Sequence, residues 1–474
     1  MSSRRSGTDA RSVVVMGGGV AGLATALLLA RDGHRVTLFE RDDLRSGGAA
    51  ENATQWRRPG IPHFLQPHAF IPRGRSELRR QLPDVYEALL AAGAWEVDTR
   101  PKLNGPTTDA DADLQYLAVR RPLIEWALRR AVAAEPRVTM RAGARLDGLP
   151  LESGRVVGAR VDGTQVDADL VVDALGRRTR THEWLAAHDI EVEPGESSDC
   201  GVVYYSRYFR CRPGFSPPDG PWYLSPRGDL GYLGYASFPG DNGTFAALLA
   251  VPTGAPEWKV FHDDVAFEAA IARIPALASW VNPDGVDPIT PVMAMAGLRN
   301  KLCAGSAVRG LVAVGDAYGH TDPVLAHGLA FGLIHAAELT RAVGENDDIA
   351  DAVSDYVAAT APALRERYDY ATALDEQRLR MWLGGDVDFA HHDGDYALFT
   401  IVAGGVAATT DAALARVFLR RIGLLDSTRV LDDDLALRQR IEAAFEEAVR
   451  TPRPRSGPTR AEMLATVGRA AVES

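Results

Sequence analysis

Cysteine is scarce in this chain of 474 residues, which contains only Cys200, Cys211 and Cys303. An odd count without CxxC spacing predicts no disulfide framework, and we expect the protein to reside in the cytoplasm. The sequence also lacks the GxSxG, Walker and HExxH motifs. No sequence motif therefore supports a hydrolase or a nucleotide-hydrolysing activity.

An excess of positive charge is missing as well. The formal net charge is -11 at pH 7, whereas nucleic acid or an anionic membrane surface would favour a basic partner. The length is enough for two or three domains, and a hydrophobic content of 46% is typical of a globular protein. We therefore expect a small-molecule ligand, with no nucleic-acid partner and no membrane insertion.

One long stretch carries no charge, residues 13–30 (VVVMGGGVAGLATALLLA), and three arginines precede it. Eighteen uncharged residues approach the length of a membrane span, and a basic start before an apolar stretch is typical of a signal peptide. Four of these residues are glycine, however, and each glycine inside a helix costs roughly 1 kcal/mol relative to alanine. The stretch is therefore predicted to form a buried strand, a glycine turn and a helix.

The turn has the spacing Gly17-x-Gly19-x-x-Gly22, and a second strand after it ends at Glu40. A strand before, a helix after and an acid about twenty residues on predict a dinucleotide-binding motif. Gly17 permits the tight turn, Gly19 lets a pyrophosphate approach the backbone, and Gly22 allows close packing of the helix. Glu40 is expected to accept hydrogen bonds from ribose hydroxyls, which suits FAD or NAD rather than NADP.

Three separated segments then line up with one family. They are the glycine-rich start, DALGRRTRT at residues 173–181 and GDAYGHTDPVLAHGLAFG at residues 315–332. In their order and spacing the chain resembles the FAD-dependent monooxygenases of the para-hydroxybenzoate hydroxylase superfamily. It looks most like the polyether-epoxidase-like bacterial members that act in natural-product pathways. The resemblance covers residues 12–345.

The resemblance implies an α/β fold with a Rossmann-like, three-layer FAD-binding domain, an antiparallel β-sheet substrate domain and a helical C-terminal region. The predicted division of the chain is a disordered N-terminus at 1–11, a discontinuous FAD-binding domain at 12–190 and 297–345, the substrate domain at 191–296 and the helical region at 346–474. Aromatic, strand-like segments distinguish the substrate domain.

The resemblance also implies how the chain holds flavin. Asp316 would bind the ribityl chain, and Pro323 would lie over the isoalloxazine. Gly328 and Leu329 would begin a helix whose N–H groups face the N1 and C2 carbonyl edge, where reduced flavin gathers negative charge. Arg121 would contact the FAD phosphate or ribityl region. The predicted cofactor-binding residues are Gly17, Gly19, Val20, Ala21, Gly22, Glu40, Arg41, Arg121, Gly176, Gly315, Asp316, Pro323, Gly328 and Leu329.

The chain departs from the family pattern at three positions. Leu175 replaces an acid that helps the family handle NADPH, so electrons are expected from NAD(P)H directly or through a separate flavin reductase. Ala326 replaces a family glycine, which predicts a stiffer backbone near the flavin. Leu65 stands where the epoxidases tend to have arginine. It lies in residues 41–75, predicted to form a long loop before a helical segment at 76–93.

Further candidate functional residues could equally serve the fold alone, through packing or hydrogen bonding. His68 and His327 are candidate catalytic residues that would orient substrate or stabilise reduced flavin, although structural hydrogen bonding is the favoured interpretation. Arg129 and Arg130 are interpreted as part of a solvated helix face. The acidic run at 384–396 contains histidines but no ligand spacing, so no metal site is predicted. An apolar substrate pocket is predicted from Tyr204, Trp222, Tyr232, Tyr235, Met293 and Met295, although core packing explains any single one.

The leading functional hypothesis is an FAD-dependent monooxygenase that hydroxylates or epoxidises a hydrophobic or aromatic molecule through a flavin C4a-hydroperoxide, with molecular oxygen as co-substrate. Three alternatives stay open. A flavin-dependent halogenase shares the fold. The tryptophan halogenases carry a WxWxIP sequence and an essential lysine, whereas this chain lacks WxWxIP and has only three lysines. A prenyl-reductase-like saturase would work without oxygen. A flavin-bound protein that sequesters a ligand without turnover is the third.

Overall fold

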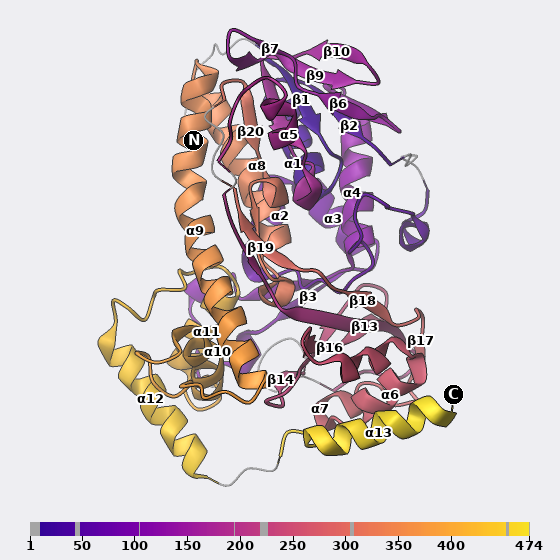
Figure 1. The fold of residues 1–474 in the computed structure, drawn as a ribbon, viewed down its shortest axis with the longest axis vertical. Coiled ribbons are helices and arrows are strands. Elements are labelled where there is room, and N and C mark those ends of the chain that lie inside the picture. Colours follow the sequence, from indigo (N-terminus) through magenta and orange to yellow (C-terminus); the bar gives the residue numbers. More distant parts are fainter. Residues whose placement is uncertain are drawn as a thin grey trace.

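The structure is a computed structural model that describes residues 10–42, 48–103, 105–193, 195–218, 226–303, 308–451 and 455–473. Figure 1 shows three parts: a sheet flanked by helices, a second sheet crossed by the long strand β13 (Val202–Cys211), and a group of C-terminal helices. Helix α9 (Ile349–Trp382) runs along one side from the first part to the third (Figure 1). Its 34 residues extend about 50 Å.

A five-stranded parallel sheet forms the centre of the first part, with the order β20-β11-β1-β2-β5. These strands are β1 (Ser12–Met16), β2 (Arg35–Glu40), β5 (Val138–Ala142), β11 (Leu170–Asp173) and β20 (Leu311–Ala313). The strand order reverses at β1, which has β2 on one side and β11 on the other. Ligands of such sheets bind in the crevice beyond the carboxyl ends of the strands at this point.

Both faces of the parallel sheet are covered, which explains its uninterrupted apolar strands. Val13 and Val15 pack with helices on one face, and Val14 and Met16 pack with a small antiparallel sheet on the other. The helices are α1 (Val20–Arg31), α4 (Arg121–Ala134) and α8 (Gly328–Glu345), and the small sheet is β6 (Leu146–Gly148), β9 (Gly158–Val161) and β10 (Thr164–Asp167). This arrangement confirms the predicted α/β fold with a Rossmann-like layer.

The second part is a six-stranded sheet with the order β14-β15-β16-β13-β17, in which β18 also pairs with β13. Besides β13, its strands are β14 (Arg227–Asp229), β15 (Gly234–Pro239), β16 (Thr244–Pro252), β17 (Val286–Pro288) and β18 (Met293–Met295). Aromatic side chains such as Tyr205 and Phe209 bury one face against helix α6 (Asp264–Ala272) and helix α13 (Arg460–Glu473). Tyr204 points to the opposite face, toward the end of α9.

The remaining elements connect these parts. The helices are α2 (Pro72–Gln81), α3 (Pro83–Ala91), α5 (Thr181–Ala186), α7 (Pro275–Ala278), α10 (Tyr396–Ala407), α11 (Ala412–Ile422) and α12 (Leu435–Arg450). The strands are β3 (Trp95–Asp98), β4 (Gln115–Ala118), β7 (Leu151–Glu152), β8 (Arg155–Val156), β12 (Glu196–Asp199), β19 (Arg299–Leu302) and β21 (Gly319–His320). No helix among the described residues is long and apolar enough to cross a membrane.

Three local predictions need correction. Arg11 was assigned to a disordered N-terminus, but it is buried and donates hydrogen bonds to the carbonyl oxygens of Asn346 and Asp347 at 2.6 and 2.7 Å. The predicted helical segment at 76–93 is two helices, because Pro83 lacks the N–H that would continue the first. The loop before it ends earlier than predicted, since α2 already begins at Pro72.

Candidate active site

Crowding fixes two of the glycines in the turn after β1. Gly17 has φ +108°, and a Cβ atom there would lie 2.5 Å from the carbonyl oxygen of Ala174. A Cβ atom on Gly22 would lie 1.9 Å from the carbonyl oxygen of Gly17. Helix α1 can therefore approach the strand end only where residue 22 has no side chain.

Gly19 serves a different purpose, because its Cβ position faces a cavity and has no other group closer than 3.8 Å. Gly19 is also the N-cap residue of α1, and no described side chain caps this helix. The first N–H groups of a helix lack partners within it and carry partial positive charge. This end of α1 therefore fits an anionic group such as a pyrophosphate.

Glu40 lies at the end of β2 and lines the same cavity. Its carboxylate accepts hydrogen bonds from the backbone N–H of Gly18 at 3.0 Å and of Asp42 at 2.9 Å. The guanidinium of Arg58 lies 3.0 Å from it. An ionised carboxylate has about four acceptor positions, so these contacts leave capacity for a ribose hydroxyl.

Arg58 and Arg129 hold the glycine turn through the carbonyl oxygen of Gly18. The sequence predicted this role for neither residue. Arg58 comes from the loop after β2, and both guanidinium groups donate to the carbonyl oxygen of Gly18, at 3.2 and 3.0 Å. Arg129 is 1% exposed, so its assignment to a solvated helix face was wrong. Its spacing of eight from Arg121, two helical turns, places both on one face of α4 and was the available signal.

Arg121 brings positive charge to the cavity. Its Nε donates to Glu125 at 2.9 Å, its Nη1 lies 2.9 Å from His63 Nε2, and its Nη2 is the group 3.8 Å from the Cβ position of Gly19. Burial, together with Arg121 and Arg177, lowers the pKa of His63 well below its usual value. His63 is therefore neutral, and Arg121 supplies the charge that a phosphate would need.

Asp316 follows the left-handed Gly315 (φ +58°) at the end of β20. Arg177, within the second family motif, donates from Nε to the Asp316 carboxylate at 3.0 Å. Burial would raise the pKa of Asp316, but the neighbouring positive charge, above all that of Arg177, outweighs it and lowers the pKa to about 2. Asp316 is thus an ionised acceptor in the cavity, as ribityl hydroxyls require. Arg177 was not predicted.

The segment after Asp316 leads into helix α8, which begins at Gly328 as predicted. Ala326 has φ +57°, a left-handed conformation that favours glycine, and it stands where the family has glycine. No side chain among the described residues caps the N-terminus of α8. Its N–H groups beside Gly328 and Leu329 are therefore available to a ligand that carries negative charge.

These groups surround one cavity of about 1320 Å³, larger than the roughly 300–1,000 Å³ typical of a single small-ligand site. Of the predicted cofactor-binding residues, those that line it are Gly17, Gly19, Val20, Ala21, Glu40, Arg41, Arg121, Gly176, Gly315, Asp316, Pro323, Gly328 and Leu329. Gly22 does not line it, because it packs beneath Gly17. Two uncapped helix ends, an open backbone at Gly19 and two carboxylates fit FAD.

The predicted substrate pocket is only partly assembled. Tyr204, Tyr235 and Met295 line the cavity. Tyr232 does not: Gly231 turns the chain before β15, and Tyr232 stacks on Trp258 in the core. Met293 pairs with Ser206, two residues along β13 from Tyr204, and does not line the cavity. Trp222 lies outside the described residues.

Both candidate catalytic histidines line the cavity, and both are neutral. Burial and the nearby Arg121 lower the pKa of His68 to about 3, and its Nδ1 lies 2.7 Å from the carbonyl oxygen of Gln66. Burial and Arg367 lower the pKa of His327 well below its usual value. Neither side chain therefore offers the positive charge that would stabilise reduced flavin.

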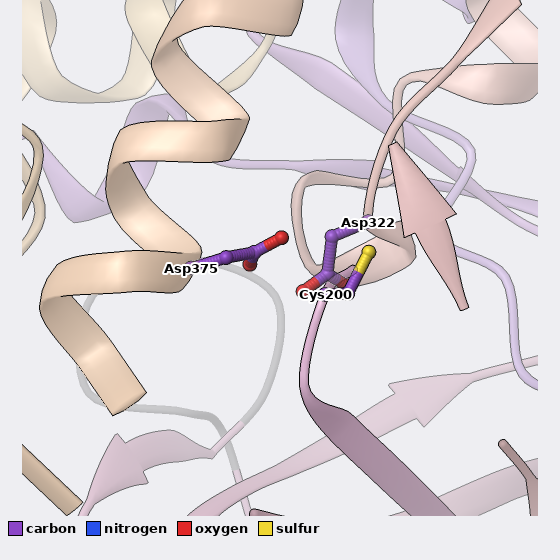
Figure 2. Close-up of side chains that lie close together, drawn as sticks. All are labelled: Cys200, Asp322 and Asp375. Atoms are coloured by element: carbon purple, nitrogen blue, oxygen red, sulfur yellow. The ribbon is translucent and has the colours of Figure 1, made fainter. Parts of the chain in front are cut away.

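A buried polar network lies directly behind Pro323. Asp322 accepts hydrogen bonds from Tyr204 at 2.5 Å and Arg378 at 2.6 Å, and Arg378 also donates to Asp375 at 2.8 Å. Burial and the neighbouring Asp322 raise the pKa of Asp375 to about 8. Figure 2 shows Asp375 on its helix directed toward Asp322 and Cys200. These three could ligate a metal by residue type, but Asp322 is already paired with Arg378 and Asp375 keeps its proton, so the network is neutral without a metal.

Asp229 is a carboxylate on the sheet side of the cavity. Trp382, the last residue of α9, donates from Nε1 to both of its oxygens, at 2.8 and 3.0 Å. Burial raises the pKa of Asp229 to about 6. A substrate with a hydrogen-bond donor would find an acceptor here.

The C-terminal helices complete the cavity wall, a role that the sequence did not reveal. Residues of α9, α10 and α11 line it, among them Leu374, Met381, Ile401, Val402 and Phe418. Figure 1 shows α10 and α11 beside the lower end of α9, next to the second sheet. The substrate side of the cavity thus lies between a sheet and a helical layer.

Comparison with known proteins identifies the class first. Residues 12–183 match the family described as FAD dependent oxidoreductase. These residues include the glycine turn, Glu40, Arg121 and the second motif, so the match falls on the cofactor end of the cavity. Residues 12–183 therefore form an FAD-dependent oxidoreductase domain, and the chain is an oxidoreductase enzyme.

Particular relatives extend the likeness. The chain is 27% identical over 461 residues to Protein Rv3254 of Mycobacterium tuberculosis, covering 89% of this chain and 91% of that protein. It is 31% identical over 177 residues to the FAD-dependent monooxygenase OpS4 of Beauveria bassiana, covering 35% of this chain and 38% of OpS4.

Two solved structures share the fold. The first is PqsL, a probable FAD-dependent monooxygenase from Pseudomonas aeruginosa, with a TM-score of 0.58, 17% identity, and coverage of 79% of this chain and 99% of that one. The second is the flavin-dependent brominase Bmp2, with a TM-score of 0.61, 15% identity, and coverage of 92% and 98%. At these identities the likeness concerns the fold.

Proposed function

We propose that this protein is an FAD-dependent monooxygenase that hydroxylates or epoxidises a hydrophobic or aromatic small molecule in bacterial secondary metabolism. The observation that carries the proposal is the continuity of the cavity, which reaches from Gly19 past Asp316 and Pro323 to the apolar wall at Met295 and Ile401. An enzyme that transfers an atom between a flavin-activated reagent and a substrate must hold both in contact.

At the cofactor end, the chain binds and orients FAD. The N-terminus of α1 and Arg121 would hold the pyrophosphate, Glu40 would hold the ribose, and Asp316 would hold the ribityl chain. Pro323 and the N-terminus of α8 would meet the ring system. When bound, reduced FAD supplies the electrons that activate molecular oxygen, of which one atom passes to the substrate and the other leaves as water.

At the substrate end, the chain excludes water and positions the reacting group. Leu248, Ala250, Met295 and Met381 present apolar surface to the cavity. A dry site limits loss of a reactive oxygen species to water. We infer that residues 12–190 and 297–345 hold FAD, and that 191–296 holds the substrate together with the helical region 346–474.

The test is oxygen incorporation. The purified protein is loaded with FAD, reduced by NADH, by NADPH or by a separate flavin reductase, and given a panel of hydrophobic compounds, both aromatic and long-chain aliphatic, under isotopically heavy oxygen gas. We expect a substrate-dependent product whose mass shows one added heavy oxygen atom. Leu175 in place of the family acid leads us to expect slow direct reduction by NADPH and faster turnover with the separate reductase.

The same assay separates the alternatives. A halogenated product that requires bromide or chloride would identify a halogenase. Lys259 and Lys301, the lysines whose side chains the structure describes, do not line the cavity, which disfavours this outcome. Turnover without oxygen would identify a saturase. Tight FAD binding and ligand binding with no product from the whole panel would identify a binding protein and overturn the proposal.

A further inference from the structure

One face of helix α10 forms an apolar branch of the cavity. Its lining residues follow helical spacing and none is charged: Leu398, Ile401, Val402, Gly405 and Val406, with Thr409 just after the helix. The opposite face, with Phe399, Ala403 and Ala407, packs in the core formed with α12. Val402 and Val406 also touch the edge of that core, so packing fixes α10 while this face still borders the cavity.

The wall opposite α10 comes from three other segments. Phe418 and Ile422 of α11 line the branch near Ala326, and Leu374 of α9 packs with Leu325 and Leu398. Leu325 and Ala326 directly follow Pro323, the residue placed against the flavin ring. The branch is thus lined by the residues after Pro323 and by helices α9 to α11, and none of these belongs to the second sheet, where the substrate pocket was predicted.

His327 is the polar group of this branch. It is 3% exposed and lines the cavity, and neither ring nitrogen has a hydrogen-bond partner among the described residues. The nearby Arg367 and Arg421 donate instead to the carbonyl oxygens of Asp426 and Thr428. A neutral imidazole offers one donor and one acceptor, and leaving them unpaired in a buried position costs free energy.

We propose that the branch binds an elongated aliphatic segment of the substrate, and that a hydroxyl or carbonyl group on this segment hydrogen-bonds to His327. This inference rests on the proposed function and specifies its substrate class: a molecule with a long aliphatic chain rather than a compact aromatic one. Leucine, isoleucine and valine dominate the lining, and they favour a flexible alkyl chain over a stacked ring. Ordered water is a poor occupant, because it requires two to four polar partners.

The experiment measures binding without turnover. Calorimetry on the oxidised, FAD-loaded protein gives the affinity for 1-alkanols of increasing chain length. Each buried methylene contributes about 0.8 kcal/mol, so affinity is expected to rise about fourfold per methylene until the branch is full. A flat dependence on chain length would overturn the proposal.

Matched variants locate the site. Val406→Phe fills the branch and is expected to remove the gain with chain length. Val417→Phe is the control, because Val417 packs against the same core cluster as Val406 but does not line the cavity. Thr409→Phe also fills the branch, and it does so at an exposed position, so it serves if Val406→Phe folds poorly. If the two filling variants and the control show the same gain in alkanol affinity with chain length, this site is excluded.

The hydrogen bond is tested with ligand pairs of equal length. Wild type is expected to prefer a 1-alkanol over the corresponding 1-chloroalkane by about 2- to 12-fold, the range of a net hydrogen bond, and His327→Leu is expected to lose this preference. A preference that survives in His327→Leu would refute the role of His327. The binding experiment needs no turnover, so its outcome is separate from that of the oxygen-incorporation assay. Oxygen incorporation together with binding that does not depend on chain length would refute only the proposal for the branch. Binding that depends on chain length together with no oxygen incorporation would refute only the monooxygenase activity.

Discussion

The two ends of the cavity are built differently. At the cofactor end, the glycines at 17–19 and the carboxylate that ends the next strand line the cavity, Gly22 packs beneath them, and the constraint lies in the backbone. At the substrate end, side chains from β13, the loop after Asp316 and helices α9 to α11 meet, although they are separated by up to two hundred residues. The first end is specified locally, and the second by tertiary packing.

The largest expected effect tests the backbone constraint. Gly22→Ala places a Cβ atom where the carbonyl oxygen of Gly17 lies 1.9 Å away, so strand and helix must separate. We expect a loss of about 3 kcal/mol of stability or more and loss of bound FAD. Gly468→Ala is the control, because Gly468 is exposed in α13 with no atom within 4 Å of its Cβ position, and alanine should stabilise that helix by up to about 1 kcal/mol. Thermal unfolding and the flavin absorbance of the purified proteins measure both; a tolerated Gly22→Ala would contradict the close approach.

A smaller effect is expected where the cofactor end depends on a side chain. Asp316→Ala removes the proposed acceptor of the ribityl hydroxyls and leaves Arg177 without its ion pair. Hydrogen bonds to charged groups contribute roughly 1.5–3 kcal/mol, so FAD affinity should fall about 10- to 100-fold while the fold persists. Fluorescence titration with FAD measures the loss. Asp433→Ala, at an exposed position outside the cavity, should bind FAD like wild type.

This difference explains what the sequence could predict. The strand, turn and helix of residues 12–31 follow from local spacing, because glycine positions and apolar runs determine them before any long-range contact forms. The Rossmann-like sheet and the start of α8 at Gly328 were instead implied by the family resemblance. The resemblance supplied Asp316 and Pro323, which line the cavity; their contact with FAD stays a prediction.

The substrate end could not be predicted in the same way. Tyr232 and Tyr235 look equivalent in sequence and pack in the same core cluster, but of the two only Tyr235 also lines the cavity. Helical spacing in α10 predicts two faces, yet it does not say which face meets a neighbour and which faces a cavity. Arg58 comes from a loop without periodicity, so no pattern indicated that it would reach Gly18.

A further effect, which depends on pH, concerns the network of Asp322, Asp375, Arg378 and Tyr204 behind Pro323. The raised pKa of Asp375, about 8 against a usual 3.8, means that the unfolded chain releases this proton as pH rises above about 4, whereas the folded protein keeps it until about pH 8. This group therefore lowers stability as pH rises through that window.

Asp375→Asn cannot ionise in either state and should gain stability relative to wild type from pH 5 to pH 8.5. Its amide can replace the proton between the two side chains, so the network should remain. Thermal midpoints of both proteins across this range measure the difference. The neighbouring ionisable groups Asp322, Arg378 and Tyr204 are present in both proteins, so their effects cancel in the comparison. Parallel curves would mean that Asp375 is ionised, and that Arg378 alone balances two carboxylates behind the flavin-facing loop.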